Sequence, residues 1–588
     1  MVAVVTGMGA AARNRAPRRA AGGGADRTTG PGPRSPATTP APKAARRRRQ
    51  HPHAVPTATA LLAATLWAAY VAARGFAFSN DSMSYAALAR AFDGGHWFTS
   101  NILAFGTAPG RFRGEWPPLY PALVAVGHAL GLTLPWSEFV LSGLAFTAAA
   151  VFGVQASRTA GDGVPWAAVP LLAGFPAALY VAGFGWSEPV CLALLGLHYW
   201  LAARAARMAA RGRPAPPGLF FAQAFTAGLA FLDRYAAGAF LPAALALPIL
   251  LGAPGSPARR RGAVAAALGA ALPTVPWAAA CIAITGRLGA HYLRAGTGLG
   301  GALHMTLGGL HQVAGWFLTA GNGASAPGSG PRLVVALCIC TGLGVVLPVT
   351  ARRRRAPAGK PLRPRAVLAG MLVADTLLST AVVIGWRARY LFDPIDPRLL
   401  APSLYTALLA ALVLLSFVPW RPTRELALLP LSAVLLWHGL RWGASAVRNP
   451  RVPAALAGPW CTAGAAGDCG MMRWLSQHTT GADLIVGNAS FIINFQLGRT
   501  TEDVEAYPYN PDPTPRELGR WTTEWTADRP GGRVFLVLDS DTGPVDGSGP
   551  VMAAFWSKPG PDLPGVRAAL VASGASYRIW RLTPRGLE

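Results

Sequence analysis

Residues 57–75 read TATALLAATLWAAYVAARG, and residues 76–85 continue as FAFSNDSMSY. The first segment is long and apolar enough to cross a bilayer as a helix, because a crossing needs about 20 mostly apolar residues. The second segment places Asp81 just beyond that crossing. A carboxylate beside a membrane span predicts a functional site at the membrane surface. The simpler alternatives are that Asp81 is a solvated loop acid, or that it caps the next helix, since Asp is a favourable cap.

The composition extends the membrane prediction to most of the chain. The 588 residues are 52% hydrophobic and only 13% charged, which is too apolar for an ordinary soluble protein of this size. The formal charge of +27 would also suit a nucleic-acid-binding protein, but the arginines fall in short clusters between apolar stretches. We therefore interpret the charge as a topology signal and expect no nucleic-acid partner. Residues 1–55 hold ten Arg, one Lys and one acid, and predict a disordered basic cytoplasmic tail without a signal peptide.

The basic clusters determine how many times the chain crosses the membrane. Clusters expected to stay in the cytoplasm must be separated by an even number of crossings. The first two clusters are Arg46 to Arg49 and Arg204, Arg207, Arg211 and Arg213. Between them the sequence has five apolar stretches, at 57–75, 118–134, 137–157, 165–183 and 189–203. The stretch at 118–134 is the weakest, because Pro117, Pro118 and Pro121 interrupt it. We predict that it is a re-entrant or interfacial helix on the outer side, within a large first outer loop at 76–136.

The predicted fold is an all-α polytopic membrane protein with a small C-terminal α/β domain. The other four stretches named above are predicted to cross the membrane. Seven later crossings bring the total to about 11 transmembrane helices, and they lie at 217–232, 236–252, 262–285, 331–350, 366–386, 399–419 and 424–444. This puts the N-terminus in the cytoplasm, residues 286–330 outside, and the C-terminus outside. Residues 56–449 form the membrane domain. Residues 450–588 are less apolar and predict an extracytoplasmic domain with a helix at 471–478, strands at 483–487 and 533–539, and a helix at 564–573.

Six cysteines do not make a disulfide framework in a chain of this kind. Four of them lie in apolar spans and are expected to be buried hydrophobic residues. Cys461 and Cys469 follow the last span. They could form a disulfide if that side is extracytoplasmic, and the sequence leaves the pairing open.

Acids and arginines gather together at the predicted outer ends of the spans, whereas the cytoplasmic ends carry basic residues alone. An outward-facing polar cavity explains this arrangement, since burying a charge in the apolar layer is costly unless it is paired or wet. Each residue also has a simpler explanation. Glu188 could cap a helix, Asp233 and Arg234 could form a local ion pair, and the acids of Asp393-Pro-Ile-Asp396-Pro could only shape a turn. The outer set is Asp81, Asp93, Arg111, Arg113, Glu115, Glu188, Asp233, Arg234, Arg387, Arg389, Asp393, Asp396 and Arg398.

The order of these segments resembles GT-C fold glycosyltransferases, the group that includes protein O-mannosyltransferases and aminoarabinose transferases. The similar segments are Asp81-Ser-Met-Ser-Tyr85-Ala-Ala-Leu-Ala89, Trp116-Pro-Pro-Leu-Tyr-Pro121, Trp186-Ser-Glu188, Gly228-Leu-Ala-Phe-Leu-Asp-Arg234-Tyr235 and Asp393 to Pro402. The resemblance covers about residues 57 to 500. Two positions depart from the pattern: Ser82 stands where many relatives carry a second acid, and Leu399-Leu400 follows Arg398 where relatives have Tyr-Leu.

The resemblance implies an enzyme that moves a sugar from a polyprenyl-phosphate donor to an acceptor hydroxyl at the outer face of the cytoplasmic membrane. Asp81 is the implied catalytic base, and inversion by direct displacement is the implied course. Either Arg398 or Arg234 could hold the departing phosphate. The full set of implied substrate-binding residues is Tyr85, Glu115, Glu188, Arg234, Arg389, Asp393, Asp396 and Arg398. No cofactor is expected, although Asp393 and Asp396 could instead bind a divalent cation.

Two other functional classes fit the same spans. A transporter or lipid flippase of envelope precursors is the main alternative, although such proteins tend to carry inverted repeats and acids at mid-membrane. A non-catalytic envelope protein is the second. Asp539-Ser-Asp541 mimics the Asp-x-Asp of soluble nucleotide-sugar transferases, and we interpret it as a turn at a strand end. The acceptor could be a glycan, a lipid or a protein.

Overall fold

The structure is a computed structural model. It describes residues 54–95, 102–103, 116–160, 166–285, 298–319, 364–389, 395, 397–416, 421–448, 470–503, 515–529, 531–539 and 563–585. All of them belong to one compact unit, His53–Glu588. Residues 1–53 of the predicted tail, the predicted crossing at 331–350, and both Cys461 and Cys469 lie outside the described residues.

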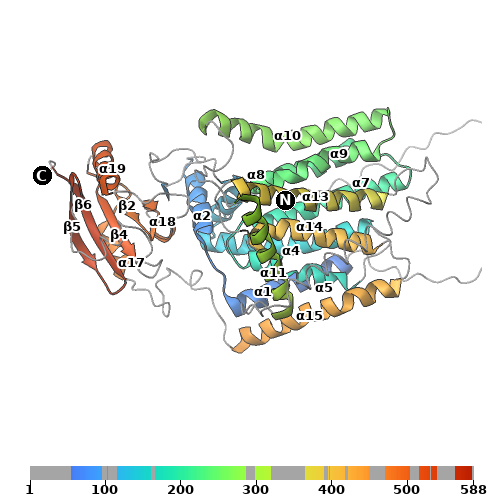
Figure 1. The fold of residues 1–588 in the computed structure, drawn as a ribbon, viewed down its shortest axis with the longest axis horizontal. Coiled ribbons are helices and arrows are strands. Elements are labelled where there is room, and N and C mark those ends of the chain that lie inside the picture. Colours follow the sequence, from blue (N-terminus) through green and yellow to red (C-terminus); the bar gives the residue numbers. More distant parts are fainter. Residues whose placement is uncertain are drawn as a thin grey trace, which may run out of the picture. The chain divides into compact units, whose positions relative to one another are not determined.

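Helices dominate the described part of the chain (Figure 1), and several are long and apolar enough to identify a membrane protein. Six described helices are long and apolar enough to cross a bilayer: Ala54–Arg74, Leu134–Ala160, Glu188–Ala210, Pro257–Ile284, Ala366–Arg389 and Pro397–Leu415. These lie in α1 (Ala54–Arg74), α4 (Leu134–Ala160), α7 (Glu188–Ala210), α10 (Pro257–Thr285), α13 (Pro364–Arg389) and α14 (Pro397–Leu415). The predicted count of about 11 crossings is therefore not confirmed.

Shorter helices occupy several of the other predicted crossings. They are α5 (Ala168–Ala173), α6 (Pro176–Ala182), α8 (Pro217–Asp233), the 3-10 helix η2 (Tyr235–Phe240) and α9 (Leu241–Leu251), and the longer α15 (Arg421–Arg448) covers the last crossing. The predicted crossing at 165–183 is divided because Pro176 has no backbone N–H and holds Phe175 out of the helical conformation (ψ 114°). Helix α3 (Leu119–Ala129) begins after Pro118 and ends before Gly131, whose φ of 93° is left-handed. Its 11 residues are too few to cross as a helix.

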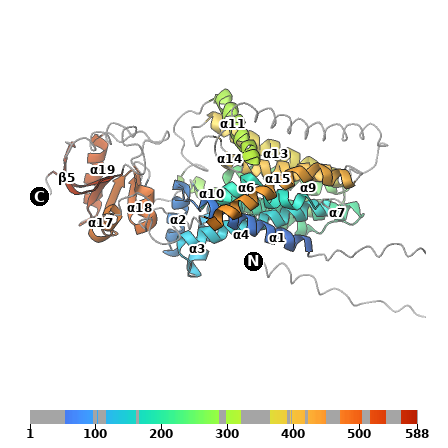
Figure 2. The same cartoon turned by 90° about the horizontal axis from the view of Figure 1, so that it is seen from below.

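The predicted outer connection 286–330 contains a helix that the sequence analysis did not anticipate. This helix is α11 (Gly298–Thr319), and it runs steeply across the long helices (Figures 1 and 2). Leu299 and Leu307 on α11 are exposed (62% and 61%), whereas Ala302 and Thr306 are buried. An amphipathic helix with exposed leucines fits a position beside lipid.

The C-terminal domain is a six-stranded mixed sheet with helices on both faces. Its strands have the order β1-β3-β2-β4-β6-β5, and the first four are parallel. The elements are α17 (Gly470–His478), β2 (Leu484–Gly487), α18 (Ser490–Leu497), β3 (Thr500–Asp503), α19 (Pro515–Asp528), β4 (Val534–Asp539), β5 (Val566–Ser573) and β6 (Tyr577–Pro584). Both β2 and β4 are fully buried, as central parallel strands must be. The predicted helix at 471–478 and both predicted strands are confirmed.

The predicted helix at 564–573 is wrong, because this segment forms strand β5. Alanines at 568, 569 and 572 favour a helix locally. Pairing with β6 overrides that preference, since Val566 to Ser573 are aligned antiparallel with Pro584 to Arg578. Gly574, predicted to stop the helix, instead donates its N–H to Tyr577 O across the hairpin turn (2.9 Å).

The predicted first outer loop contributes to the C-terminal sheet. Strand β1 (Ile102–Leu103) pairs with β3 in parallel register. The helix before it, α2 (Asn80–Asp93), carries Arg90, which donates to Asn494 O (2.8 Å) and Phe495 O (2.5 Å) in the last turn of α18. Because the last carbonyls of a helix lack partners within it, a guanidinium there stabilises the helix end. Helix α2 is thereby tied to the C-terminal domain.

Candidate functional site

Four charged side chains from four separate helical elements meet at one end of the bundle, which we call the site end. The carboxylates of Asp81 and Glu188 both pair with Arg398, and the Arg398 Nε to Glu188 Oε1 distance is 2.5 Å. Arg234, at the end of α8, pairs with the same Glu188 oxygen. Glu188 is fully buried, and the side chains of the other three are 11% to 16% exposed. Such a buried cluster is stable because the opposite charges pair with each other.

Backbone pairing between two chain connections holds the acids of the cluster in place. Ala77, between α1 and α2, donates to Gly183 O (3.0 Å) and accepts from Gly185 N–H (3.2 Å). Ala77 and Phe184 form an isolated parallel bridge. The connection before Asp81 is thus fixed against the connection before Glu188, although more than 100 residues separate the two acids in sequence.

Asp81 is not the cap of α2, so that simpler explanation of this residue is wrong. Ser79 occupies the N-cap position and forms a capping box with Ser82. Asp81 lies in the first turn, where a carboxylate is favoured by the helix dipole, and it faces Arg398. Two other residues also differ from their simpler explanations. Arg234 pairs with Glu188 rather than with its neighbour Asp233. Ser187, not Glu188, occupies the N-cap position of α7, and Glu188 is the first residue of that helix.

Trp186 orients the central arginine, and the sequence analysis did not identify it as a site residue. The Arg398 guanidinium lies over the Trp186 ring at 4.4 Å, and the Phe184 ring stacks on Trp186 at 4.0 Å with an interplanar angle of 6°. Two groups this close cannot share one face of the ring, so they lie on opposite faces. The indole N–H donates to Ser79 Oγ (2.6 Å), which fixes the ring against the start of α2.

Tyr85 lies on α2 one turn after Asp81 and is buried beneath the cluster. Its hydroxyl lies 3.4 Å from Ser187 Oγ, and its ring contacts Trp116 and Tyr120. Burial raises the pKa of the Tyr85 phenol well above its usual range, and the nearby carboxylates of Asp81 and Glu188 raise it further. The phenol therefore stays neutral and can donate a hydrogen bond at physiological pH.

Glu138 is a second buried acid near the cluster that the sequence analysis missed. It lies in the first turns of α4, is fully buried, and neither carboxylate oxygen has a hydrogen-bond partner among the described residues. Its Oε2 occupies the space beside Gly185, where a Cβ would overlap it, and the Ser82 Cβ lies 3.2 Å from that same position. Its position within an apolar span was the available signal, because intramembrane acids usually mark functional sites.

The structure describes only part of the predicted substrate-binding set. It brings Tyr85, Glu188, Arg234 and Arg398 together around Asp81. Arg389, the last residue of α13, is exposed instead. Glu115, Asp393 and Asp396 lie outside the described residues. Within the described ranges no three His, Cys, Asp or Glu side chains form a potential metal site.

Comparison with known proteins identifies the fold. No protein-family model matches the chain, and no curated protein matches it. The crystal structure of ArnT from Cupriavidus metallidurans in the apo state is 15% identical, with a TM-score of 0.53 over 89% of this chain and 97% of that one. The cryo-EM structure of arabinofuranosyltransferase AftD from Mycobacteria is 17% identical, with a TM-score of 0.50 over 89% of this chain and 40% of that one. The chain thus has the fold of GT-C membrane glycosyltransferases.

Proposed function

We propose that the chain is a membrane glycosyltransferase that moves a sugar from a polyprenyl-phosphate donor to an acceptor hydroxyl. The observation that carries this proposal is the buried cluster of Asp81, Glu188, Arg234 and Arg398 at the site end of the bundle. It combines a carboxylate that can accept a proton with guanidinium groups that can hold a phosphate. The shared fold with ArnT and AftD supports the same activity.

The proposed reaction is a single displacement. Asp81 takes the proton of the acceptor hydroxyl, and the oxygen attacks the anomeric carbon of the donor sugar. The bond from that carbon to the phosphate oxygen breaks, and the polyprenyl phosphate leaves with the bonding electrons. A guanidinium beside the leaving oxygen stabilises the charge that develops there. Because attack and departure occur on opposite sides of the carbon, the anomeric configuration inverts.

Arg398 is the proposed partner of the leaving phosphate. It contacts both carboxylates, and a guanidinium has five N–H donors in a planar fork that suits phosphate oxygens. Glu188 sits between Arg398 and Arg234 and keeps the two cations together against their mutual repulsion. We assign Glu188 and Trp186 to positioning of Arg398, and Tyr85 to substrate binding.

The site end is proposed to face outward from the cytoplasmic membrane, with the N-terminus inside. The basic clusters support this orientation, because they fall at the opposite ends of the spans. A reporter fused after residue 450 is expected to be extracytoplasmic. A cytoplasmic reporter at that position would overturn the orientation and return Asp539 and Asp541 to consideration as nucleotide-sugar ligands.

The proposal is tested with purified protein in liposomes that contain a radiolabelled polyprenyl-phosphate sugar and a membrane extract as the source of acceptors. We expect the label to appear in a new glycosyl product, with an equal amount of polyprenyl phosphate released. Movement of the intact lipid-linked sugar between leaflets, with no such product, would instead identify a flippase.

A further inference from the structure

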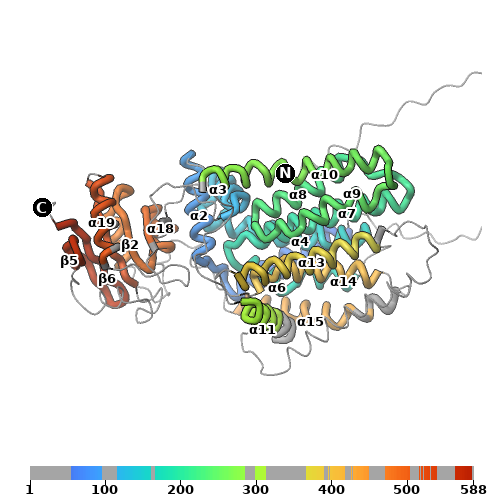
Figure 3. Tube along the Cα trace, turned by 45° about the horizontal axis from the view of Figure 1, so that its top comes forward, coloured from blue at the N-terminus to red at the C-terminus, as the bar shows by residue number. Residues whose placement is uncertain are grey.

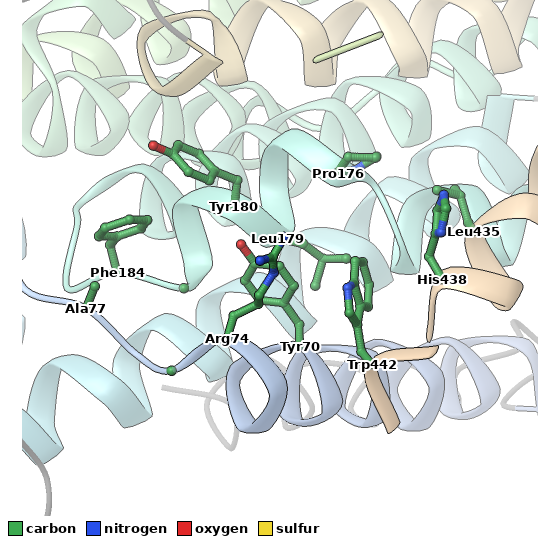
Figure 4. Close-up of a pocket in the computed structure, with 12 residues that line it drawn as sticks. Tyr70, Arg74, Ala77, Pro176, Leu179, Tyr180, Phe184, Leu435, His438 and Trp442 are labelled. Carbon is green, nitrogen blue, oxygen red and sulfur yellow. The ribbon is translucent and has the colours of Figure 1, made fainter. Parts of the chain in front are cut away.

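A second site lies on the far side of Phe184 from the charged cluster. It is a cavity of about 250 Å³ between α1, α6 and α15 (Figure 4). None of the substrate-binding residues named above lines it. The twelve lining residues are Tyr70, Arg74, Gly75, Ala77, Pro176, Leu179, Tyr180, Gly183, Phe184, Leu435, His438 and Trp442.

The cavity is polar and basic at one end and mostly apolar at the other, where the buried His438 lies beside Leu435 (Figure 4). Arg74 is the last residue of the apolar helix α1, is exposed, and is the one arginine, lysine or acid among the twelve lining residues. The Tyr70 ring meets the Trp442 ring edge-on at 5.1 Å beside it. Leu435 precedes Trp442 by seven residues on α15, which places it about 10 Å further into the bundle. Pro176 and Leu179 complete the apolar end.

The two long helices that enclose the cavity also carry an outward apolar surface. On α15, Trp437 is 60% and Leu440 is 68% exposed, and Leu61 on α1 is 66% exposed. Large apolar side chains exposed on a helix of a membrane protein contact lipid. The cavity therefore borders the membrane, and Arg74, at the end of a span, lies at the level of lipid headgroups.

We propose that this cavity binds the phosphate headgroup of an anionic membrane phospholipid. The phosphate contacts Arg74, and the first carbons of one chain lie against Leu179 and Leu435. The cavity volume is below the roughly 300 Å³ at which pockets begin to hold drug-sized ligands, so the rest of the lipid stays in the bilayer. This proposal stands on the cavity itself and does not require sugar transfer.

The bound lipid would also support the charged cluster. Phe184 lines the cavity and also stacks on Trp186, whose other face carries Arg398. A lipid that fills the cavity limits movement of Phe184 and so keeps Trp186 in place. We therefore infer that the bound lipid helps to position Trp186 and Arg398. It is a different molecule from the polyprenyl-phosphate donor on which the cluster acts.

Native mass spectrometry of the full chain from nanodiscs tests the proposal, with phosphatidylglycerol or phosphatidylcholine as the added lipid. We expect retained phosphatidylglycerol, and about fivefold less of it in Arg74→Gln, since one basic residue near a membrane surface contributes about that factor in affinity. Arg74→Lys keeps the charge and should retain most of the lipid. Arg448→Gln is the matched control, because Arg448 is the exposed last residue of α15 and does not line the cavity.

Three outcomes would overturn the proposal. Equal retention of both lipids would show that the cavity does not prefer an anionic headgroup. Unchanged retention in Arg74→Gln would place the lipid elsewhere. Displacement of the phosphatidylglycerol by stoichiometric polyprenyl phosphate, again dependent on Arg74, would show that the cavity belongs to the donor. Each readout is independent of the transfer assay, so failure here leaves the proposed function standing.

Discussion

Two carboxylate–guanidinium groups in this chain, each built on a buried acid, differ in how many of their carboxylate oxygens have hydrogen-bond donors. In the C-terminal domain, the Asp483 carboxylate accepts from Arg533 N (2.9 Å), Nε (3.0 Å) and Nη2 (2.8 Å), and from Thr480 N (2.6 Å). Both of its oxygens are satisfied. At the site end of the bundle, Glu188 Oε2 and both oxygens of Glu138 have no hydrogen-bond partner among the described residues.

The difference separates a structural ion pair from a functional one. Asp483 ends the turn before β2 and Arg533 precedes β4, so their bonds join two neighbouring strands. Strand β2 lies in the C-terminal part of the chain, beside the labelled α18 (Figure 3). Both oxygens of the Asp483 carboxylate are therefore already held by donors of the chain itself. In the bundle, the buried carboxylates of Glu188 and Glu138 have oxygens with no donor among the described residues. A buried acceptor without a donor costs free energy of folding. That cost is explained if a substrate hydroxyl supplies the missing donors.

The largest effect is expected from Arg398→Ala, which removes the guanidinium shared by Asp81 and Glu188. Sugar transfer should fall by at least about 100-fold, since charge stabilisation in the transition state is lost. Removing one partner of a buried ion pair also lowers the free energy of unfolding by about 3–5 kcal/mol. The transfer assay and thermal unfolding in detergent measure the two effects. Arg211→Ala, an exposed arginine at the end of α7, serves as control, and equal losses in both variants would contradict the assignment.

Gly185→Ala should also lower the rate of sugar transfer, although it removes no charged group. The new Cβ would overlap Glu138 Oε2, so the connection that carries Trp186 and Glu188 must shift. A displacement of about 1 Å can lower an enzymatic rate by about 100-fold. Glu138→Ala in the same chain removes the overlap and should restore part of the transfer rate. No recovery in the double variant would show that Gly185 acts by another route.

Asp483→Asn should affect stability without affecting transfer. The substitution weakens the hydrogen bonds between residue 483 and Arg533. A hydrogen bond to a charged group contributes about 1.5–3 kcal/mol to the free energy of unfolding. We expect faster hydrogen exchange of the β2 and β4 amides, with the transfer rate of the folded protein within twofold of the unchanged chain. A large loss of transfer would make the C-terminal pair part of the functional machinery.

The smallest effect is the pH dependence of the same domain. Burial alone would raise the pKa of Asp483, but hydrogen bonds from Arg533 and Thr480 outweigh it and hold that pKa below its usual range. The pair's stabilisation is therefore fully present above the unfolded value of about 3.9 and is lost as the pH falls through the lower folded pKa. Hydrogen exchange should show the β2 amides losing protection below about pH 4. Asp483→Asn should remove this dependence, and persistence of the same acid transition would assign it to another group.

The sequence predicted which residues share an end of the bundle, but not which of them pair. The positions of Asp81, Glu188, Arg234 and Arg398 at span ends follow from apolar length and basic clusters, which are local features. Their pairing depends on the backbone bridge at Ala77 and Phe184, which joins segments more than 100 residues apart. No local pattern encodes such a contact.

The residues that the sequence analysis missed have physical reasons as well. Glu138 lies at the outer end of the predicted span 137–157, but it has only uncharged neighbours in sequence and so does not stand out as part of a charged segment. Trp186 was part of a recognised segment, but its contact with Arg398 comes from a helix more than 200 residues later. The Ala-rich strand β5 looked helical because its exposed edge position places little demand on side-chain alternation.

One assay distinguishes a catalytic carboxylate at position 81 from a structural one: the initial rate of sugar transfer from a polyprenyl-phosphate donor, measured for Asp81→Asn and Asp93→Asn. Both acids lie on α2, and Asp93 is a partly exposed residue 3.6 Å from His128. We predict that Asp81→Asn lowers the rate by about 100-fold or more, as expected for loss of a general base. Asp93→Asn should transfer within twofold of the unchanged chain. Transfer by folded Asp81→Asn at the rate of the Asp93 variant would contradict the proposed mechanism.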